Sequence, residues 1–455
     1  MFQLFSNYKS HYKSLITLGF PIIIGQLGAI VTGFADTIMV GQHTTAELAA
    51  ASFTNNVINA FIVLGTGFSF NLTPLIGGFL AKNNKRAIGA LVKNSLFANF
   101  TTTLLLISIL GIIYWNLDAL DQPTELMPLI RPYFLISLSS VVFVMLYNSF
   151  RQFIEGIAHP ALSMWVLLAG NLLNIIGNYI LIYGKFGAPE LGLFGAGIST
   201  LLSRIFMLGL FIMVFAFGKK FHAYRCGFAA GRINRKSWKQ LNAIGWPIGM
   251  QQGLEAGTFC LTAIMVGWIG SLELAAHQIA ITISTISFTI YLGLGAAVAI
   301  RTSFYKGAND WFMVRKITLA GIHLALVVVA AICIFLFFSK SWLGNIFTED
   351  VAVNDVVQIL LPILMLYQLG DSIQIILANA LRGLADVQYI MWVSFGAYFL
   401  VAIPAGYALG FPLAWGIAGV WMAYPIGFIT SDVFLITRMR NKCRKHLQPQ
   451  MAGSI

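Results

Sequence analysis

Three acidic residues, Asp36, Glu255 and Asp371, lie well inside long apolar stretches of the sequence. A charged side chain in the middle of a bilayer costs roughly 2.5–3.5 kcal/mol on insertion scales. A membrane protein tolerates this cost when the acid faces a cavity, pairs with a partner, or takes up and releases a cation. Acids in these positions therefore predict ion-coupled transport.

Two of the acids have polar neighbours at helical spacing. Residues at intervals of three and four share one face of a helix, which here joins Gln251, Thr258 and Thr262 to Glu255, and Tyr367 and Gln374 to Asp371. Two carboxylates offer hard oxygen ligands for Na⁺, or a shared site for a proton. The alternative is a pair of structural acids, each hydrogen-bonded to a neighbouring helix. We expect Glu255, Asp371 and Tyr367 to bind the coupling cation, with Gln251, Thr258 and Gln374 as candidates for the substrate cleft.

The first half of the chain has a polar stripe of its own. Asn171, Asn174 and Asn178 share one helical face, and Asp36 shares another with Ala29 and Gly33 among its members. Amide carbonyls can complete the coordination of a cation held by a carboxylate. Asparagines in membrane helices also hold helices together without any other role, so both readings stay open here.

The elements that position these residues are membrane helices. Of 455 residues, 58% are hydrophobic and 10% are charged, against about 25% charged in soluble domains. Apolar segments of about 20 residues recur, without the alternation of a transmembrane barrel. The sequence predicts an all-α integral membrane protein with twelve transmembrane helices, near 15–40, 48–74, 88–115, 127–153, 161–184, 191–217, 241–268, 274–300, 315–338, 355–380, 388–410 and 413–437.

The chain contains an internal repeat. Residues 19–50 align without a gap on 245–276, with 13 identities in 32 positions at an offset of 226, and 155–165 match 382–392 at an offset of 227. This offset spans six helices, an even number, so the copies are parallel repeats. We expect two pseudo-symmetric six-helix bundles, 1–217 and 241–455, joined by a basic linker at 218–240. The acids are not duplicated, because Asp36 aligns with Thr262 and Glu255 with Ala29.

Charge placement predicts the orientation. With the N-terminus in the cytoplasm, 24 Lys and Arg residues fall in inside segments and three in outside segments, the positive-inside asymmetry. Both termini are therefore expected in the cytoplasm, and the net charge of +12 does not indicate nucleic-acid binding. Arg204 lies within a span, where we expect it to pair with a carbonyl or reach toward the interface. Glu155 and Asp432 fall near the ends of spans, where we expect their cost to be small.

Several function classes lack their motifs. The sequence contains no GxxxxGK[ST], HExxH or GxSxG pattern, so neither direct use of ATP nor an intramembrane enzyme is indicated. No cofactor is expected apart from a coupling ion. A passive channel would not need two bundles with non-equivalent acids.

Four motifs together resemble the multidrug and toxic compound extrusion (MATE) family, in its bacterial NorM-like branch. They are ADTIMVG with Asp36, PIGMQQGLEAGTF with Glu255, YQLGDSIQIILANALRGLAD with Tyr367 and Asp371, and EGIAHP at 155–160. The resemblance covers essentially the whole chain. It implies two six-helix lobes around a central cleft, and export of cationic, amphipathic compounds in exchange for inward Na⁺ or H⁺.

The resemblance also implies roles for individual residues. Glu255, Tyr367 and Asp371 match the cation site of the C-terminal lobe, where Glu255 and Asp371 would be the Na⁺ ligands if the ion is sodium. Asp36, Asn174 and Asn178 match a site in the N-terminal lobe. Relatives in other branches carry an acid where this chain has Asn178, so that lobe has one carboxylate fewer. A functional monomer in the bacterial inner membrane is expected.

Two questions stay open at the level of sequence. Carboxylates with a tyrosine and amide carbonyls serve either Na⁺ or H⁺, so the coupling ion is not fixed. A lipid or oligosaccharide flippase of the same superfamily is the competing function. Such a protein usually lines its cleft with several basic residues, whereas acids are found here.

Overall fold

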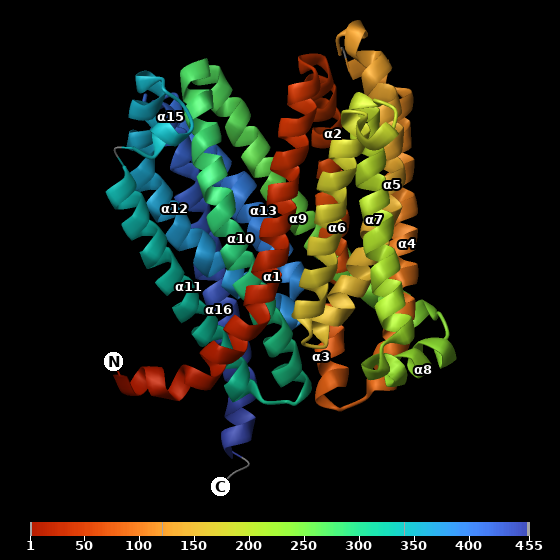
Figure 1. The fold of residues 1–455 in the computed structure, drawn as a ribbon. Coiled ribbons are helices and arrows are strands. Elements are labelled where there is room, and N and C mark those ends of the chain that lie inside the picture. The colour runs from red at the N-terminus through yellow and green to blue at the C-terminus, as the bar shows by residue number, and fades with distance from the viewer. Residues whose placement is uncertain (1, 121, 341, 453–455) are drawn as a thin grey trace. The chain divides into compact units, whose positions relative to one another are not determined.

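The computed structural model describes residues 2–120, 122–340 and 342–452, with side chains for 8–120, 122–340 and 342–447 (Figure 1). The described residues form helices and no strand, which confirms the predicted fold class. The α-helices are α1 (Phe2–His43), α2 (Thr45–Ser69), α3 (Thr73–Ala81), α4 (Lys85–Trp115), α5 (Met127–Gly156), α6 (Pro160–Ile182), α7 (Gly192–Phe217), α8 (His222–Ala230), α9 (Arg235–Ile269), α10 (Ser271–Gly307), α11 (Trp311–Ser339), α12 (Val351–Gly383), α13 (Val387–Phe395), α14 (Ile403–Gly410), α15 (Gly416–Trp421) and α16 (Ala423–Ala452).

Eleven helical segments of the described chain are long and apolar enough to cross a membrane. The twelfth expected segment, 241–268, lies in α9, which has 35 residues. At about 1.5 Å per residue, α9 can cross a hydrocarbon core of about 30 Å. Its polar residues Gln251, Gln252 and Glu255 lower its hydropathy. The least apolar of the twelve segments therefore carries one of the three acids.

The chain forms two compact units. Unit 1 comprises residues 1–23 and 250–455, and unit 2 comprises residues 24–249. The chain passes between the units inside α1 and inside α9, not in the segment 218–240. Each crossing lies two or three residues beyond a proline within its helix, Pro21 in α1 and Pro247 in α9. The role of 218–240 as a cytoplasmic linker stays a prediction.

The repeat is visible in the backbone as well as in the sequence. Asn83 and Asn309 both adopt a left-handed conformation, with φ of 53° and 58°. The residue after each caps the next helix, Asn84 for α4 and Asp310 for α11. Such caps satisfy N–H groups that a helix leaves unpaired. Equivalent turns in the two halves therefore share a left-handed asparagine followed by a residue that caps the next helix.

The segment 218–240 contains one helix that sequence analysis did not predict. This helix, α8, packs against α4 at two glycines, each placed against the backbone of the other helix. A methyl group on Gly89 would lie 1.9 Å from the carbonyl oxygen of Tyr224, and one on Gly227 would lie 1.9 Å from that of Arg86. Only glycine permits this approach. The helix α8 is thus attached to unit 2.

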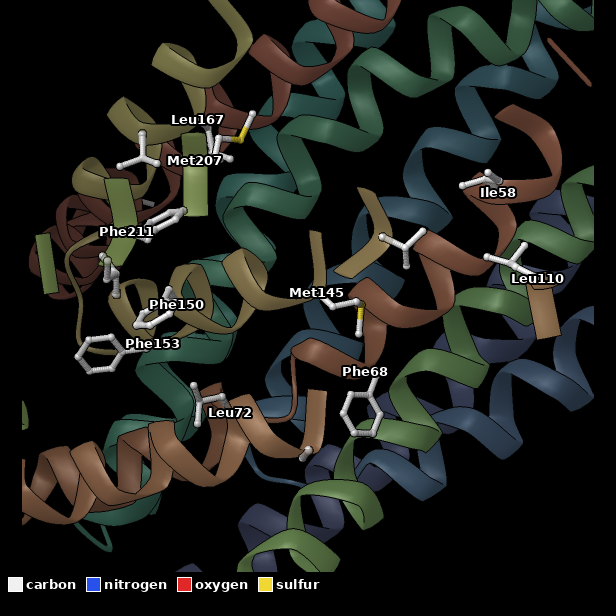
Figure 2. Packing of buried hydrophobic residues seen from close by; sticks show 14 of the residues in the cluster. Ile58, Phe68, Leu72, Leu110, Met145, Phe150, Phe153, Leu167, Met207 and Phe211 are labelled. Atoms are coloured by element: carbon white, nitrogen blue, oxygen red, sulfur yellow. The ribbon is translucent and has the colours of Figure 1, made fainter. Parts of the chain in front are cut away.

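Each unit has its own apolar core. In unit 2, α5 packs against α2, α4 and α7, and the buried residues between them include Phe68, Met145 and Phe153 (Figure 2). In unit 1, α12 packs against α10, α11 and α16, with Tyr367 and Trp421 among the fully buried side chains. These cores hold the helices that carry the polar residues.

Candidate cation and substrate sites

In unit 1, hydrogen bonds converge on one oxygen of Glu255. Its Oε1 atom accepts from Gln251 Nε2 at 2.8 Å, from Gln374 Nε2 at 3.2 Å and from the Tyr398 hydroxyl at 3.4 Å. Gln374 Nε2 also lies 2.7 Å from the Tyr398 hydroxyl. Hydrogen bonds from these groups favour the charged carboxylate over the neutral acid. The structure thus brings the predicted residues Glu255, Gln251 and Gln374 together.

Asp371 lies in the same unit with a different environment. Its side chain is 3% exposed, and its Oδ2 atom is buried without a hydrogen-bond partner among the described residues. Tyr367, one turn before it on α12, is 1% exposed. The Tyr367 ring packs edge-on against Tyr424 and Phe428, at centroid distances of 5.5 and 5.1 Å. Tyr367 is therefore packed against these two rings, while Asp371 has a carboxylate oxygen without a hydrogen-bond partner among the described residues.

A small cavity joins the two acids of unit 1. Its volume is about 20 Å³, and it is lined by Glu255, Thr258, Phe259, Phe288, Asp371, Gln374, Tyr398, Tyr424 and Phe428. A volume above about 10–15 Å³ holds one water-sized species. The space suits a single small cation and is far too small for an organic substrate. Thr258 and Gln374, predicted as candidates for the substrate cleft, line this small cavity instead, while Gln251 contacts it only through its hydrogen bond to Glu255.

Sequence reasoning missed two members of this site. Tyr398 lies in a π-helical turn, Gly396–Ala402, between α13 and α14, and such turns are frequent at functional sites. The repeat held a signal, because an offset of 227 aligns Tyr398 with Asn171. Arg382 lies two residues beyond the predicted span 355–380, yet it is 4% exposed and donates to Gln251 Oε1 at 3.0 Å. That bond fixes the amide of Gln251 so that its NH₂ group faces Glu255.

In unit 2, Asn178 donates a hydrogen bond from Nδ2 to Asp36 Oδ1. Asn174 donates from Nδ2 to Thr200 Oγ1 at 3.2 Å. The side-chain carbonyl oxygens of both asparagines are buried without partners among the described residues. A carboxylate and two unpaired carbonyl oxygens are hard ligands of the type that small cations prefer. The structure places the three predicted residues together, Asp36 and Asn178 in direct contact.

Unit 2 also contains a much larger cavity, of about 610 Å³. Asp36, Asn171 and Asn174 line it, together with many hydroxyl and amide side chains of α2, α5 and α7. Binding pockets for small molecules typically have volumes of about 300–1,000 Å³. The predicted cleft residues Gln251, Thr258 and Gln374 are not part of it. A drug-sized space thus lies beside Asp36, where sequence analysis placed only a cation.

Three charged residues differ from expectation. Arg204 is on the wall of the large cavity and donates to the Ser140 hydroxyl, not to a carbonyl or the interface. Glu155 is 3% exposed and pairs with Arg151 at 2.7 Å. Asp432 is 6% exposed. Both acids are buried by neighbouring helices although they lie near helix ends, and the small cost expected for them stays a prediction.

The sequence model of the MatE family matches this chain twice, at residues 21–180 and 247–408. The chain is similar to "Probable multidrug resistance protein NorM" of Photorhabdus laumondii, at 29% identity over 445 residues that cover 96% of this chain and 97% of that protein. It is 27% identical over 444 residues to "Multidrug resistance protein MdtK" of Proteus mirabilis, covering 95% and 96%. A crystal structure of MATE in the straight conformation has a TM-score of 0.88 at 19% identity, covering 96% of this chain and 97% of that one, and shares the fold.

Proposed function

The chain belongs to the MatE family of membrane transporters, and from that membership we propose that it exports cationic, amphipathic organic compounds in exchange for inward Na⁺ or H⁺ by alternating access. The observation that carries the proposal is Asp371, a carboxylate 3% exposed with an oxygen that has no partner among the described residues. A buried carboxylate is stable only when it is paired, protonated or bound to a cation. The names of the relatives, which refer to multidrug resistance, support the substrate class.

The coupling cation would bind in the small cavity of unit 1. Glu255 and Asp371 supply carboxylate oxygens, and Thr258 and Tyr398 supply hydroxyl oxygens on the same wall. The volume of about 20 Å³ accommodates one Na⁺. A proton would need only Asp371 itself. Tyr367 shapes the site by packing on Tyr424 and Phe428, which line it.

The organic substrate would bind in the large cavity of unit 2. Asp36 gives this cavity a negative charge, and hydroxyl and amide groups give it hydrogen-bond partners for varied ligands. Asn174 and Asn178 offer carbonyl oxygens that can hold a cation at Asp36 when no substrate is present. Because ion and substrate then neutralise the same carboxylate, they would exclude each other.

Coupling would follow from this competition. A cation that neutralises a carboxylate weakens binding of a cationic substrate, typically by 1–3 kcal/mol of coupling free energy, and the substrate weakens cation binding equally. The membrane potential, worth about 2.3 kcal/mol per charge per 100 mV, drives the cycle only if net positive charge enters. Ion entry would thus release substrate on the outer side.

A flippase for pyrophosphate-linked lipids is less well supported. Among the residues that line the large cavity, Arg204 is the one basic side chain. A pyrophosphate carries several negative charges and is normally held by several Arg or Lys side chains. One arginine beside one aspartate does not meet that need.

The orientation is also proposed. The 24-to-3 distribution of Lys and Arg favours an orientation with both termini and residues 218–240 in the cytoplasm of a bacterial inner membrane. A single cysteine at position 230, in a variant without the four native cysteines, would react with an impermeant reagent only in opened cells. Labelling of intact cells would contradict this orientation.

Two experiments test the function. In proteoliposomes, a fluorescent cationic drug should move against its gradient when a Na⁺ gradient or a pH gradient is imposed, each alone in a separate arm. In detergent, drug affinity should fall as Na⁺ is added at fixed pH, or as pH is lowered without Na⁺. No uphill movement in either arm would exclude the antiport function, and a drug affinity constant in both titrations would exclude competition.

A further inference from the structure

Two acids that the sequence places alike have different surroundings. The buried carboxylate of Glu155 has a counter-charge, because Arg151 Nε lies 2.7 Å away. Asp432 has no hydrogen bond or ion pair within the described part of the chain, and its Oδ1 atom is buried without a partner. An uncompensated buried charge costs several kcal/mol. Asp432 is therefore stable in this position only when a proton or another cation neutralises it, because the described side chains supply no counter-charge.

Asp432 lies close to the small cavity of unit 1. On α16, Tyr424, Phe428 and Asp432 are spaced by four residues and share one helical face. Tyr424 and Phe428 line the cavity that contains Glu255 and Asp371. Asp432 is therefore one helical turn beyond the cavity wall.

Two serine hydroxyl groups with no partner in the described part of the chain, one on α13 and one on α16, lie at the same height along these helices as Asp432. The Tyr398 ring contacts Phe428 at 6.0 Å, and the Tyr389 hydroxyl donates to the Phe434 carbonyl at 3.4 Å. These two contacts set an antiparallel register in which Ser394 is opposite Ser431. Both serine Oγ atoms are buried without partners among the described residues. Asp432, Ser394 and Ser431 thus lie along the same stretch of these packed helices, each with a buried oxygen that has no partner among the described residues.

The charged groups around Asp432 come from the elements that pack against α16. The elements packed against α16 are α11, α12, α13, α14, α15 and the π-helical turn. Of their titratable groups, Asp371 on α12 and Tyr398 on the π-helical turn interact electrostatically with Asp432. The cations Arg438 and Lys442 on α16 itself bind Asp386, at 2.7 and 2.9 Å. Arg438 and Lys442 are thus paired with Asp386 and not with Asp432.

We propose that Asp432 is a cation-handling residue, a site at which the coupling cation stops between the Glu255–Asp371 cavity and the end of unit 1 that carries Asp386. The proposal rests on the proposed antiport function. For H⁺, the carboxylate accepts and releases the proton. For Na⁺, the carboxylate oxygens of Asp432 supply the charged ligand. Both ions share one chemistry, reversible neutralisation of a buried carboxylate, and no covalent bond to carbon changes.

The test uses the full chain in proteoliposomes with Asp432→Asn. Drug movement driven by a Na⁺ gradient or by a pH gradient, in separate arms, should fall about 10- to 100-fold, as when a residue that supports an ion site is lost. Drug–drug exchange without an ion gradient, and equilibrium drug binding, should stay within about twofold of the wild type. Asp432→Glu should restore gradient-driven movement. The arm that loses activity identifies the ion.

A matched control is Thr430→Val, two residues away, whose hydroxyl bonds only its own helix at Ile426 O. It should leave gradient-driven movement unchanged. Full gradient-driven activity of Asp432→Asn would overturn the role proposed for Asp432 but not the proposed antiport function. Loss of drug binding in both Asp432 variants would show a structural role and overturn it as well. A wild type that binds the drug but shows no gradient-driven movement would overturn the proposed function, and this assignment with it.

Discussion

Gln251 donates a 2.8 Å hydrogen bond to Glu255 while its own carbonyl oxygen accepts one of 3.0 Å from Arg382. The Gln251 amide therefore connects the buried Arg382 guanidinium to the Glu255 carboxylate through two hydrogen bonds. An amide can donate and accept at once, which a carboxylate or an ammonium cannot. This property explains why an amide side chain can bridge a guanidinium and a carboxylate at this position.

The first prediction concerns this bridge. Gln251→Met keeps the volume but removes the donor, so cation affinity at Glu255 should change by about tenfold, the equivalent of about 1.4 kcal/mol for a hydrogen bond to a charged group. The readout is the ion concentration that gives half-maximal drug transport. Gln252→Met is the control, because that side chain makes no hydrogen bond to any residue that the structure describes. Equal shifts in the two variants would indicate a general effect on α9.

The second prediction concerns the two acids of the small cavity. Glu255→Gln and Asp371→Asn remove a charge at nearly constant volume, so each should reduce ion-driven export by at least about 100-fold while the protein stays folded and inserted. Export is measured at matched expression, and folding by thermal unfolding in detergent. Glu273→Gln, an acid in the first turn of α10 that does not line the cavity, should export normally. Full export by both cavity variants would remove the acids from the mechanism.

The third prediction concerns the departure at Asn178. Asn178→Asp places a second carboxylate against Asp36, and two carboxylates in contact share one proton or one cation. Cation affinity in unit 2 should rise by about tenfold, or roughly 1.4 kcal/mol. The test is Na⁺ and pH titration of drug displacement. Asn171→Asp adds the same charge on the same helix, and an equal effect there would show that contact with Asp36 is unimportant.

The fourth prediction concerns pH and the loop after α12. Burial raises the pKa of Asp386, but hydrogen bonds and charge interactions with Arg438 and Lys442 outweigh it, so the pKa lies below its ordinary value of 3.8. A lowered pKa in the folded state contributes stability above the ordinary pKa, and this contribution is lost as pH falls through the folded value. Thermal stability of the wild type should therefore decline below about pH 4.

Asp386→Asn should flatten this decline and lower the stability at pH 6–7. Asp118→Asn is the control, because its pair with Arg131 is largely exposed, with Asp118 at 71%. Exposed pairs contribute about 0–1 kcal/mol. An unchanged acid limb in Asp386→Asn would assign the decline to other groups.

The sequence was sufficient for the fold class and for the polar face of α9, because helical periodicity and internal repetition are local or pairwise patterns. It placed Glu255, Asp371, Asp36 and the asparagines within the right helices. It did not reveal that Arg382 is buried, because the residue lies at the end of an apolar segment and its burial depends on neighbouring helices. Tyr398 was missed because a π-helical turn sets its direction.

The difference between the two cavities was also beyond sequence reasoning. Polar residues line both, so residue types alone do not distinguish a space for one ion from a space for a drug. The volumes follow from side chains of several helices packed together. Aromatic residues fill the site in unit 1, whereas small hydroxyl and amide side chains leave the cavity in unit 2 open.

The attachment of α8 to α4 has a mechanical consequence. The residues between α8 and α9 are also bound to α4, since Lys93 donates to Gly231 O and Asn94 to Arg232 O and receives a bond from Asn234 N. Residues 231–234, between α8 and α9, are therefore held against α4 by hydrogen bonds. The chain passes between the compact units only within α1 and α9, so both connections are helical and neither is a loop. A proline removes one backbone hydrogen bond and allows a helix to bend at that point. The helical turns at Pro21 and Pro247 are therefore the points at which α1 and α9 can bend.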